Sequence, residues 1–136
     1  MSGGKPIGHA ETAAIWPFFI VGDVSRALAF FCGVLGFEVV FQQPQSNPFF
    51  ALIRRGGAHL FFKSVGDGVQ ATPNPTRHPD ARWDGYVYTP DPDALAAEFA
   101  AAGAAFSAPL RDNSDNLRGF EVTDPDGYVL FFGRPN

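Results

Sequence analysis

The order of elements along the chain repeats: a strand, a helix and three further strands occur twice. In the first half, hydrophobic periodicity predicts a strand at 14–21, a helix at 24–35 and strands at 37–42, 49–54 and 58–63. In the second half, it predicts a strand at 82–89, a helix at 92–102 and strands at 106–110, 117–123 and 128–134. One such unit leaves one face of its sheet bare. We therefore expect an α+β fold in which two βαβββ repeats form a curved half-barrel cleft, with the helices outside.

Capping residues support these helix boundaries. Asp23 and Asp91 each precede a predicted helix and are good N-caps, and Pro92 suits the first turn. Gly36 stands where a C-cap glycine is expected. The segment 124–127, Asp-Pro-Asp-Gly, predicts a turn between the last two strands.

The 136 residues are the length of one ordinary domain, and 46% of them are apolar, enough for a core. We expect a flexible arm at 1–12, and a single domain at 13–136 with repeat one at 13–64, a crossover at 64–81 and repeat two at 82–134. The net charge of −4 argues against nucleic-acid binding. No apolar run is long enough to span a membrane. The lone Cys32 fits a reducing compartment, so we expect a cytoplasmic protein.

Strand alternation predicts which side chains share a face. Phe19, Phe30, Phe31, Phe62 and Phe132 are expected to pack against the helices. The cleft face is expected to carry the candidate ligand-binding residues, namely Trp16, Phe18, His59, Phe61, Asp84, Tyr86, Tyr88 and Phe131. A carboxylate at Asp84 among these aromatics would attract a cationic ligand. Equally, Asp84 would simply end the crossover at the surface.

Several segments resemble the vicinal oxygen chelate superfamily, which includes glyoxalases, extradiol dioxygenases and bleomycin resistance proteins. The resemblance covers roughly 13–133 and is carried by 21–24 before Phe30-Phe31, by 35–37 and by 120–127. It implies the repeated fold but not one activity, because the superfamily hosts many.

The chain looks most similar to the bleomycin resistance proteins, on segments 35–38, 53–56 and 91–95, and on Arg118 and Phe120 before 124–125. This resemblance implies a protein without catalysis that sequesters a cationic drug in clefts at a dimer interface. Such proteins exchange an N-terminal strand near a proline. Pro17 fits that place, so a homodimer with exchanged strands is expected.

The resemblance also implies where metal-binding relatives hold a divalent ion, and here those positions are Trp16, His59, Asp84 and Phe131. Two aromatics cannot bind a metal, and a catalytic metal site usually needs three protein ligands. We therefore expect no metal, no cofactor and no catalytic residue. Two alternatives stay open. One is a metal-dependent glyoxalase-like or dioxygenase-like enzyme with displaced ligands at His59, Asp84 and Glu121. The other is a structural module whose cleft is filled by its own side chains.

Overall fold

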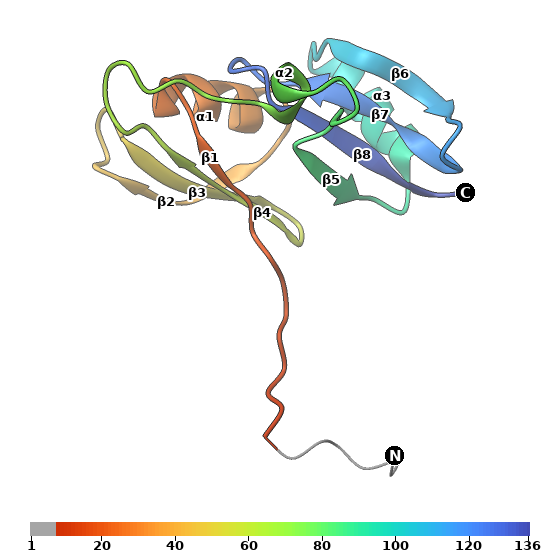
Figure 1. The fold of residues 1–136 in the computed structure, drawn as a ribbon, viewed down its shortest axis with the longest axis horizontal. Helices are drawn as coiled ribbons and strands as arrows, with labels where there is room; N and C mark the ends of the chain where they lie inside the picture. Colours follow the sequence, from red (N-terminus) through yellow and green to blue (C-terminus); the bar gives the residue numbers. More distant parts are fainter. Residues whose placement is uncertain (1–7) are drawn as a thin grey trace.

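The predicted repeat is present in the computed structural model, which describes residues 8–136 (Figure 1). The first repeat consists of β1 (Phe18–Ile20), α1 (Val24–Gly33), β2 (Glu38–Gln43), β3 (Phe50–Arg55) and β4 (Ala58–Lys63). The second consists of β5 (Gly85–Tyr88), α3 (Pro92–Ala101), β6 (Phe106–Asp112), β7 (Leu117–Thr123) and β8 (Val129–Pro135). The expected βαβββ order is thus confirmed in both halves.

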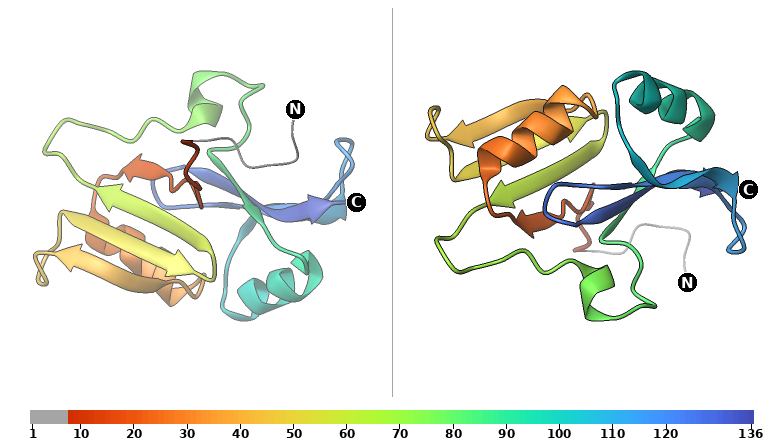
Figure 2. Two further views of the ribbon diagram at one scale, coloured as in Figure 1. Left: turned by 90° about the horizontal axis from the view of Figure 1, so that it is seen from below. Right: turned by 90° about the horizontal axis from the view of Figure 1, so that it is seen from above.

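Each repeat forms its own open four-stranded sheet. The strand orders are β1-β4-β3-β2 in the first sheet and β5-β8-β7-β6 in the second, so the two sheets have equivalent topologies. In each sheet the first strand pairs parallel to the last one, and the other pairs are antiparallel. Figure 2 shows the two sheets side by side, with α1 packed on one face of the first sheet and α3 beside the second. This arrangement confirms the α+β fold class.

The predicted caps begin both long helices. The Asp23 carboxylate accepts a hydrogen bond from the backbone N–H of Arg26 at 3.3 Å, and Asp91 accepts one from Ala94 at 3.0 Å. These bonds satisfy backbone donors that have no partner within the first turn of a helix. The helix α1 ends at Gly33 with Val34 as its C-cap, two residues earlier than predicted, and Gly36 makes the turn towards β2 with a φ of +74°, in the left-handed region that glycine enters without strain.

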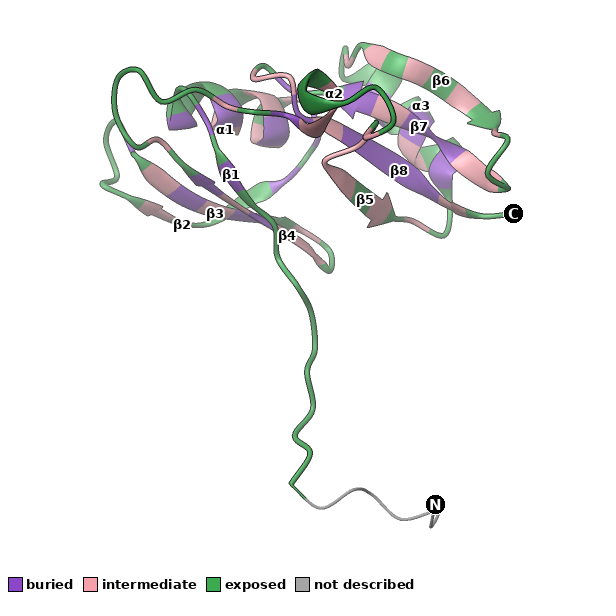
Figure 3. Cartoon of the chain, in the orientation of Figure 1, coloured by how far each residue is buried: buried purple, intermediate pink, exposed green. Residues whose placement is uncertain are grey.

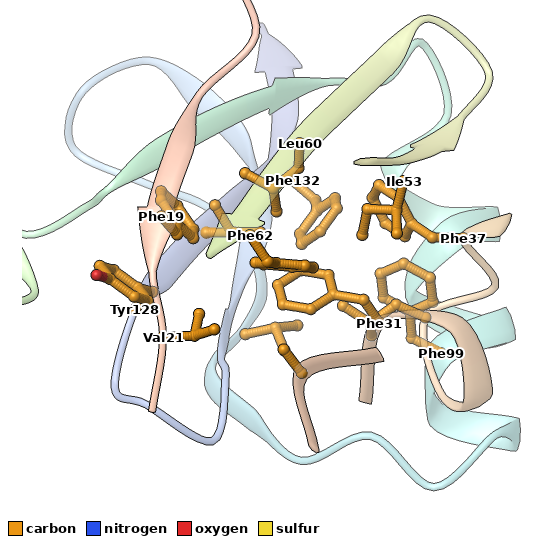
Figure 4. Close-up of a cluster of buried hydrophobic side chains, with 14 of the residues drawn as sticks. Phe19, Val21, Phe31, Phe37, Ile53, Leu60, Phe62, Phe99, Tyr128 and Phe132 are labelled. Atoms are coloured by element: carbon orange, nitrogen blue, oxygen red, sulfur yellow. The ribbon is translucent and has the colours of Figure 1, made fainter. Parts of the chain in front are cut away.

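One hydrophobic core joins the two repeats on the helix side of the sheets. Phe31 of α1 packs on Phe62 of β4 with ring centroids 5.0 Å apart, and Phe99 of α3 meets Phe132 of β8 edge-on at 5.2 Å. Both pairs belong to a single buried cluster, part of which is drawn in Figure 4. Of the five phenylalanines expected here, Phe30 is only half-buried and the others are buried.

The opposite face is more open in the first sheet than in the second, where β8 is buried over most of its length (Figure 3). Along β4, for example, Leu60 and Phe62 are buried while Phe61 between them is not. The shared core is therefore built from the helix-facing sides of both sheets. Side chains on the open outer face, such as Phe61, take no part in the core and are free to contact another molecule.

Strand β1 is shorter than the sequence predicted. It begins at Phe18 instead of residue 14, and 8–17 run away from the body as an exposed extended segment (Figure 1). The physical reason is that Pro17 has no backbone N–H to donate, so the ladder does not continue before Phe18, although the carbonyl oxygen of Pro17 still accepts the N–H of Phe61 at 2.9 Å. Of the expected flexible arm at 1–12, residues 1–7 lie outside the described part of the chain.

The crossover at 64–81 contains one short helix, α2 (Asn74–Arg77), which the sequence analysis did not predict. Its first turn is held from the second repeat, because Asp84 accepts a hydrogen bond from the backbone N–H of Asn74 at 2.6 Å.

Candidate functional site

The outer face of the first sheet is a continuous aromatic surface. Neighbouring rings lie between 4.2 and 6.2 Å apart, centroid to centroid, across all four strands; they belong to Trp16, His59, Phe61, Phe18, Phe50 and Phe41. Alternation along β1, β3 and β4 produces this surface, since every second side chain points away from the helix. Aromatic rings offer flat apolar area with few torsional degrees of freedom, which suits the binding of a planar compound.

Trp16 and His59 form the tightest pair on this surface. Their rings stack 4.2 Å apart with an interplanar angle of 12°. The Nδ1 atom of His59 lies 3.2 Å from the carbonyl oxygen of Gly57, which holds the imidazole in the plane of the stack when that nitrogen carries the proton. Both residues were predicted to lie on the cleft face, and in the structure their rings are in contact.

The outer face of the second sheet is built differently. The ring of Phe131 lies over Gly119 and Gly133, where any side chain would overlap it, and Trp83 stacks on the Phe131 ring at 4.4 Å. As a result Phe131 is only 2% exposed. The indole Nε1 of Trp83 donates a hydrogen bond to Glu121 Oε2 at 2.8 Å. We call Phe131, Trp83 and Glu121 the aromatic plug.

Trp83 was not among the predicted site residues. Alternation placed it opposite Asp84, Tyr86 and Tyr88, but it precedes β5, where the alternation rule does not apply. A signal that points to the plug is the glycine pair Gly119 and Gly133, paired across β7 and β8, because glycine inside a strand marks a close approach of other atoms.

Asp84, which was predicted to attract a cationic ligand, has a structural role. One carboxylate oxygen accepts the N–H of Asn74 at 2.6 Å, and the other accepts the N–H of Val129 at 2.8 Å. The side chain thereby fastens α2 and the start of β8 to β5. Both oxygens are thus used to hold the backbone, which is a structural role for Asp84 beside the predicted ligand contact.

A groove of about 930 Å³ runs between the β3–β4 hairpin and β5. Its walls include Ile15, Arg54 and His59 on the side of the first sheet, and Tyr86 and Tyr88 on the side of the second. Tyr88 is 65% exposed, so its ring is available to a bound molecule. A volume of this order is typical of pockets for drug-sized ligands.

The structure distributes the eight predicted site residues over four places. His59, Tyr86 and Tyr88 line the groove. Phe18 and Asp84 line a smaller hollow of about 320 Å³ beside Tyr128. Trp16, Phe61 and Phe131 line neither: Trp16 and Phe61 lie on the aromatic surface, and Phe131 lies inside the aromatic plug. The single cleft expected from the sequence is thus divided in this chain.

The four positions at which metal-binding relatives hold an ion do not fit a metal here. Trp16 and Phe131 have no ligand atoms, and the two oxygens of Asp84 bind backbone N–H groups. Within residues 8–136, no three His, Cys, Asp or Glu side chains cluster closely enough to hold an ion. The displaced set His59, Asp84 and Glu121 therefore does not come together in the described structure.

A family model describing the glyoxalase/bleomycin resistance protein/dioxygenase superfamily matches residues 7–132. The chain belongs to this superfamily. Members are recognised by their paired βαβββ units, and both units are present here. No curated protein matches the chain in sequence.

Three solved structures illustrate the shared fold. TioX from Micromonospora sp. ML1 has a TM-score of 0.69 and 23% identity, over 91% of this chain and 100% of TioX. The bleomycin-binding protein of Streptomyces verticillus, solved with copper(II)-bleomycin, has a TM-score of 0.67 and 24% identity, over 94% and 100%. TnmS3, an antibiotic-binding protein from Streptomyces sp. CB03234, has a TM-score of 0.65 and 23% identity, over 94% and 100%.

None of the helices found between residues 8 and 136 combines the length and hydrophobicity needed to cross a bilayer.

Proposed function

We propose that this superfamily member is a metal-free binding protein that sequesters an aromatic small molecule without transforming it. The observation that carries the proposal is the groove of about 930 Å³ between His59 on one side and Tyr86 and Tyr88 on the other. Its rings can stack on a planar compound, and the aromatic plug occupies the place where a metal would polarise a substrate. The fold shared with bleomycin-binding and antibiotic-binding proteins supports this reading.

The ligand-binding residues of the proposal are those predicted from the sequence, with Asp84 as a structural support instead of an anchor. Tyr88 and His59 provide the walls, Tyr86 lies beside them, and Trp16 holds the His59 ring by stacking on it. Phe18 and Phe61 continue the aromatic surface away from the groove, with ring centroids 5.3 Å apart. Phe131 lies under Trp83 on the outer face of the second sheet and is not expected to contact the ligand directly.

We further propose that the protein acts as a homodimer in which the N-terminal segment packs on a second copy. Residues 8–14 are exposed and lead away from the body of their own chain, and Ile15, where the segment reaches the groove, is 94% exposed. With Trp16 and Phe18, which are also exposed, Ile15 forms a contiguous apolar stretch, and such a stretch favours a partner surface. The open aromatic face of the first sheet offers such a surface. A cytoplasmic location completes the proposal, in line with the lone thiol of Cys32.

The groove is tested by substitution of its exposed ring. Tyr88→Ser removes a wall and is expected to weaken the binding of a planar aromatic probe such as 9-anthracenemethanol by roughly tenfold, about 1.4 kcal/mol. Phe49→Ala is the matched control, because Phe49 is 46% exposed and lines neither the groove nor the smaller hollow. Isothermal calorimetry gives both affinities. Equal affinity for the Tyr88 variant and the unchanged protein would place the ligand elsewhere.

A further inference from the structure

The charged side chains of the groove are few, and all of them are neighbours on the hairpin side. They are Glu38, Arg54 and Arg55, together with the titratable His59. Arg54 Nε donates to Glu38 Oε1 at 2.7 Å, and both side chains are more than half exposed. Arg55 donates two hydrogen bonds to Glu98, at 2.7 and 2.8 Å, and one to the carbonyl oxygen of Leu35 at 3.1 Å. Glu38 is therefore the one carboxylate among the described residues that line the groove, and it is already paired.

Two other carboxylates, those of Asp84 and Glu121, lie near the outer faces of the sheets but do not line the groove. Asp84 lines the smaller hollow and accepts two backbone hydrogen bonds. Glu121 accepts the indole N–H of Trp83 and does not line the groove. A cation in the groove would lose hydration and would have to compete with Arg54 for Glu38, and repulsion by the Arg54 guanidinium costs free energy, whereas Arg55 is directed away to Glu98 on the helix side.

Hydrogen-bond donors, in contrast, are available in the groove. Within residues 8–136, the two terminal nitrogens of Arg54 form no hydrogen bond, because its ion pair uses Nε alone. Guanidinium N–H groups match the geometry of carboxylate oxygens. Burial raises the pKa of the Tyr86 hydroxyl, and the neighbouring Tyr88 raises it further, so the Tyr86 hydroxyl stays a neutral donor at pH 7.

From this arrangement we infer that the groove takes a planar aromatic ligand carrying an acidic oxygen group that faces Arg54, and that it discriminates against cations. This inference rests on the proposed function and narrows its ligand class. It departs from the cationic ligand that the sequence analysis expected, because that expectation depended on Asp84 as a free anchor. The rings of Tyr88 and His59 bind the flat body of the ligand, and Arg54 selects its charge.

Three probes with one ring system separate charge from shape: 9-anthracenecarboxylate, 9-anthracenemethanol and 9-(aminomethyl)anthracene. Calorimetry on the full chain at pH 7 is expected to rank the carboxylate roughly threefold to tenfold tighter than the alcohol, with the ammonium weakest. Added salt is expected to weaken binding of the carboxylate and leave that of the alcohol unchanged. An ammonium probe that binds tightest would overturn the inference and leave the proposed function standing. Failure of all three to bind would overturn both.

Two substitutions locate the charge selection. Arg54→Gln is expected to reduce the ratio of carboxylate to alcohol affinity toward one, and Glu38→Gln to raise it, because Arg54 then loses its competing partner. Arg82→Gln is the matched control, since Arg82 is paired to Asp115 at 3.3 Å, is similarly exposed and does not line the groove. An affinity ratio that stays the same in the Arg54 variant would overturn the assignment.

Discussion

At the scale of single residues, the Asp-Pro-Asp-Gly turn before β8 holds the most perturbed acid of the protein. Asp124 Oδ1 accepts the N–H groups of Asp126 and Tyr128, each at 2.9 Å, while its Oδ2 is buried without a partner in the described structure. Burial raises the pKa of Asp124 to about 6, with the charge of Asp126 adding to the rise. The folded protein therefore holds a proton that the unfolded chain releases near pH 4.

This raised pKa predicts that stability falls as pH increases from 4.5 to 7. Between those pH values the folded state binds more protons than the unfolded state, so unfolding becomes easier by about 2 kcal/mol. Asp93 and Glu98 have pKa values lowered mainly by hydrogen bonds from arginine, so their contributions change at lower pH, below this window. Urea denaturation across the window measures the trend. Asp124→Asn keeps an oxygen acceptor and should flatten the curve; an equally steep curve in that variant would contradict the assignment.

The glycine pair beneath the aromatic plug predicts a second residue-scale effect. A Cβ at Gly133 would overlap the Arg118 carbonyl oxygen and the Phe131 ring, and backbone cannot move aside cheaply. Gly133→Ala is expected to destabilise the fold by about 1–3 kcal/mol, as overpacking does. Gly33→Ala is the control: a Cβ there meets nothing within 4 Å, and alanine favours the helix. Thermal denaturation compares the two. A stable Gly133 variant would mean that Phe131 does not lie over this glycine.

At the scale of elements, the repeat, both long helices and the turn before β8 followed from the sequence because their signals are local. N-cap side chains at Asp23 and Asp91 and strict alternation along β4 act within a few residues. The contacts of Asp84 and Trp83 could not be predicted, because their partners come from distant segments: Asn74 and Val129 for Asp84, and Phe131 and Glu121 for Trp83. Alternation gives the direction of a strand side chain, but it cannot identify which distant backbone or ring will meet it.

The N-terminal segment carries the prediction at this scale. If residues 8–17 pack on a second copy, Ile15→Asp places a charge in that contact and is expected to convert a dimer into a monomer. Glu11→Ala is the control on the same exposed segment. Light scattering coupled to size-exclusion chromatography gives the mass of each variant, which is 14.7 kDa for one chain. A full-length protein that is monomeric at micromolar concentration would remove the dimer from the account.

At the scale of the whole molecule, two similar repeats have been used for different purposes. Their helix-facing sides form one shared core around Phe31 and Phe99. The outer face of the first sheet keeps an open aromatic surface, whereas the second sheet has closed its equivalent position with Phe131 and Trp83. This difference between the two outer faces supports the proposal that the protein binds a ligand without transforming it.

The central claim is that the protein binds its ligand without a metal. Calorimetric titration with 9-anthracenecarboxylate tests it most directly, on protein dialysed against a strong chelator and on the same protein supplied with zinc, nickel or manganese. The account predicts the same affinity in every sample, because Trp16 and Phe131 offer no ligand atoms and Asp84 is held by backbone N–H groups. Binding that disappears after chelation and returns with one of these ions would contradict it.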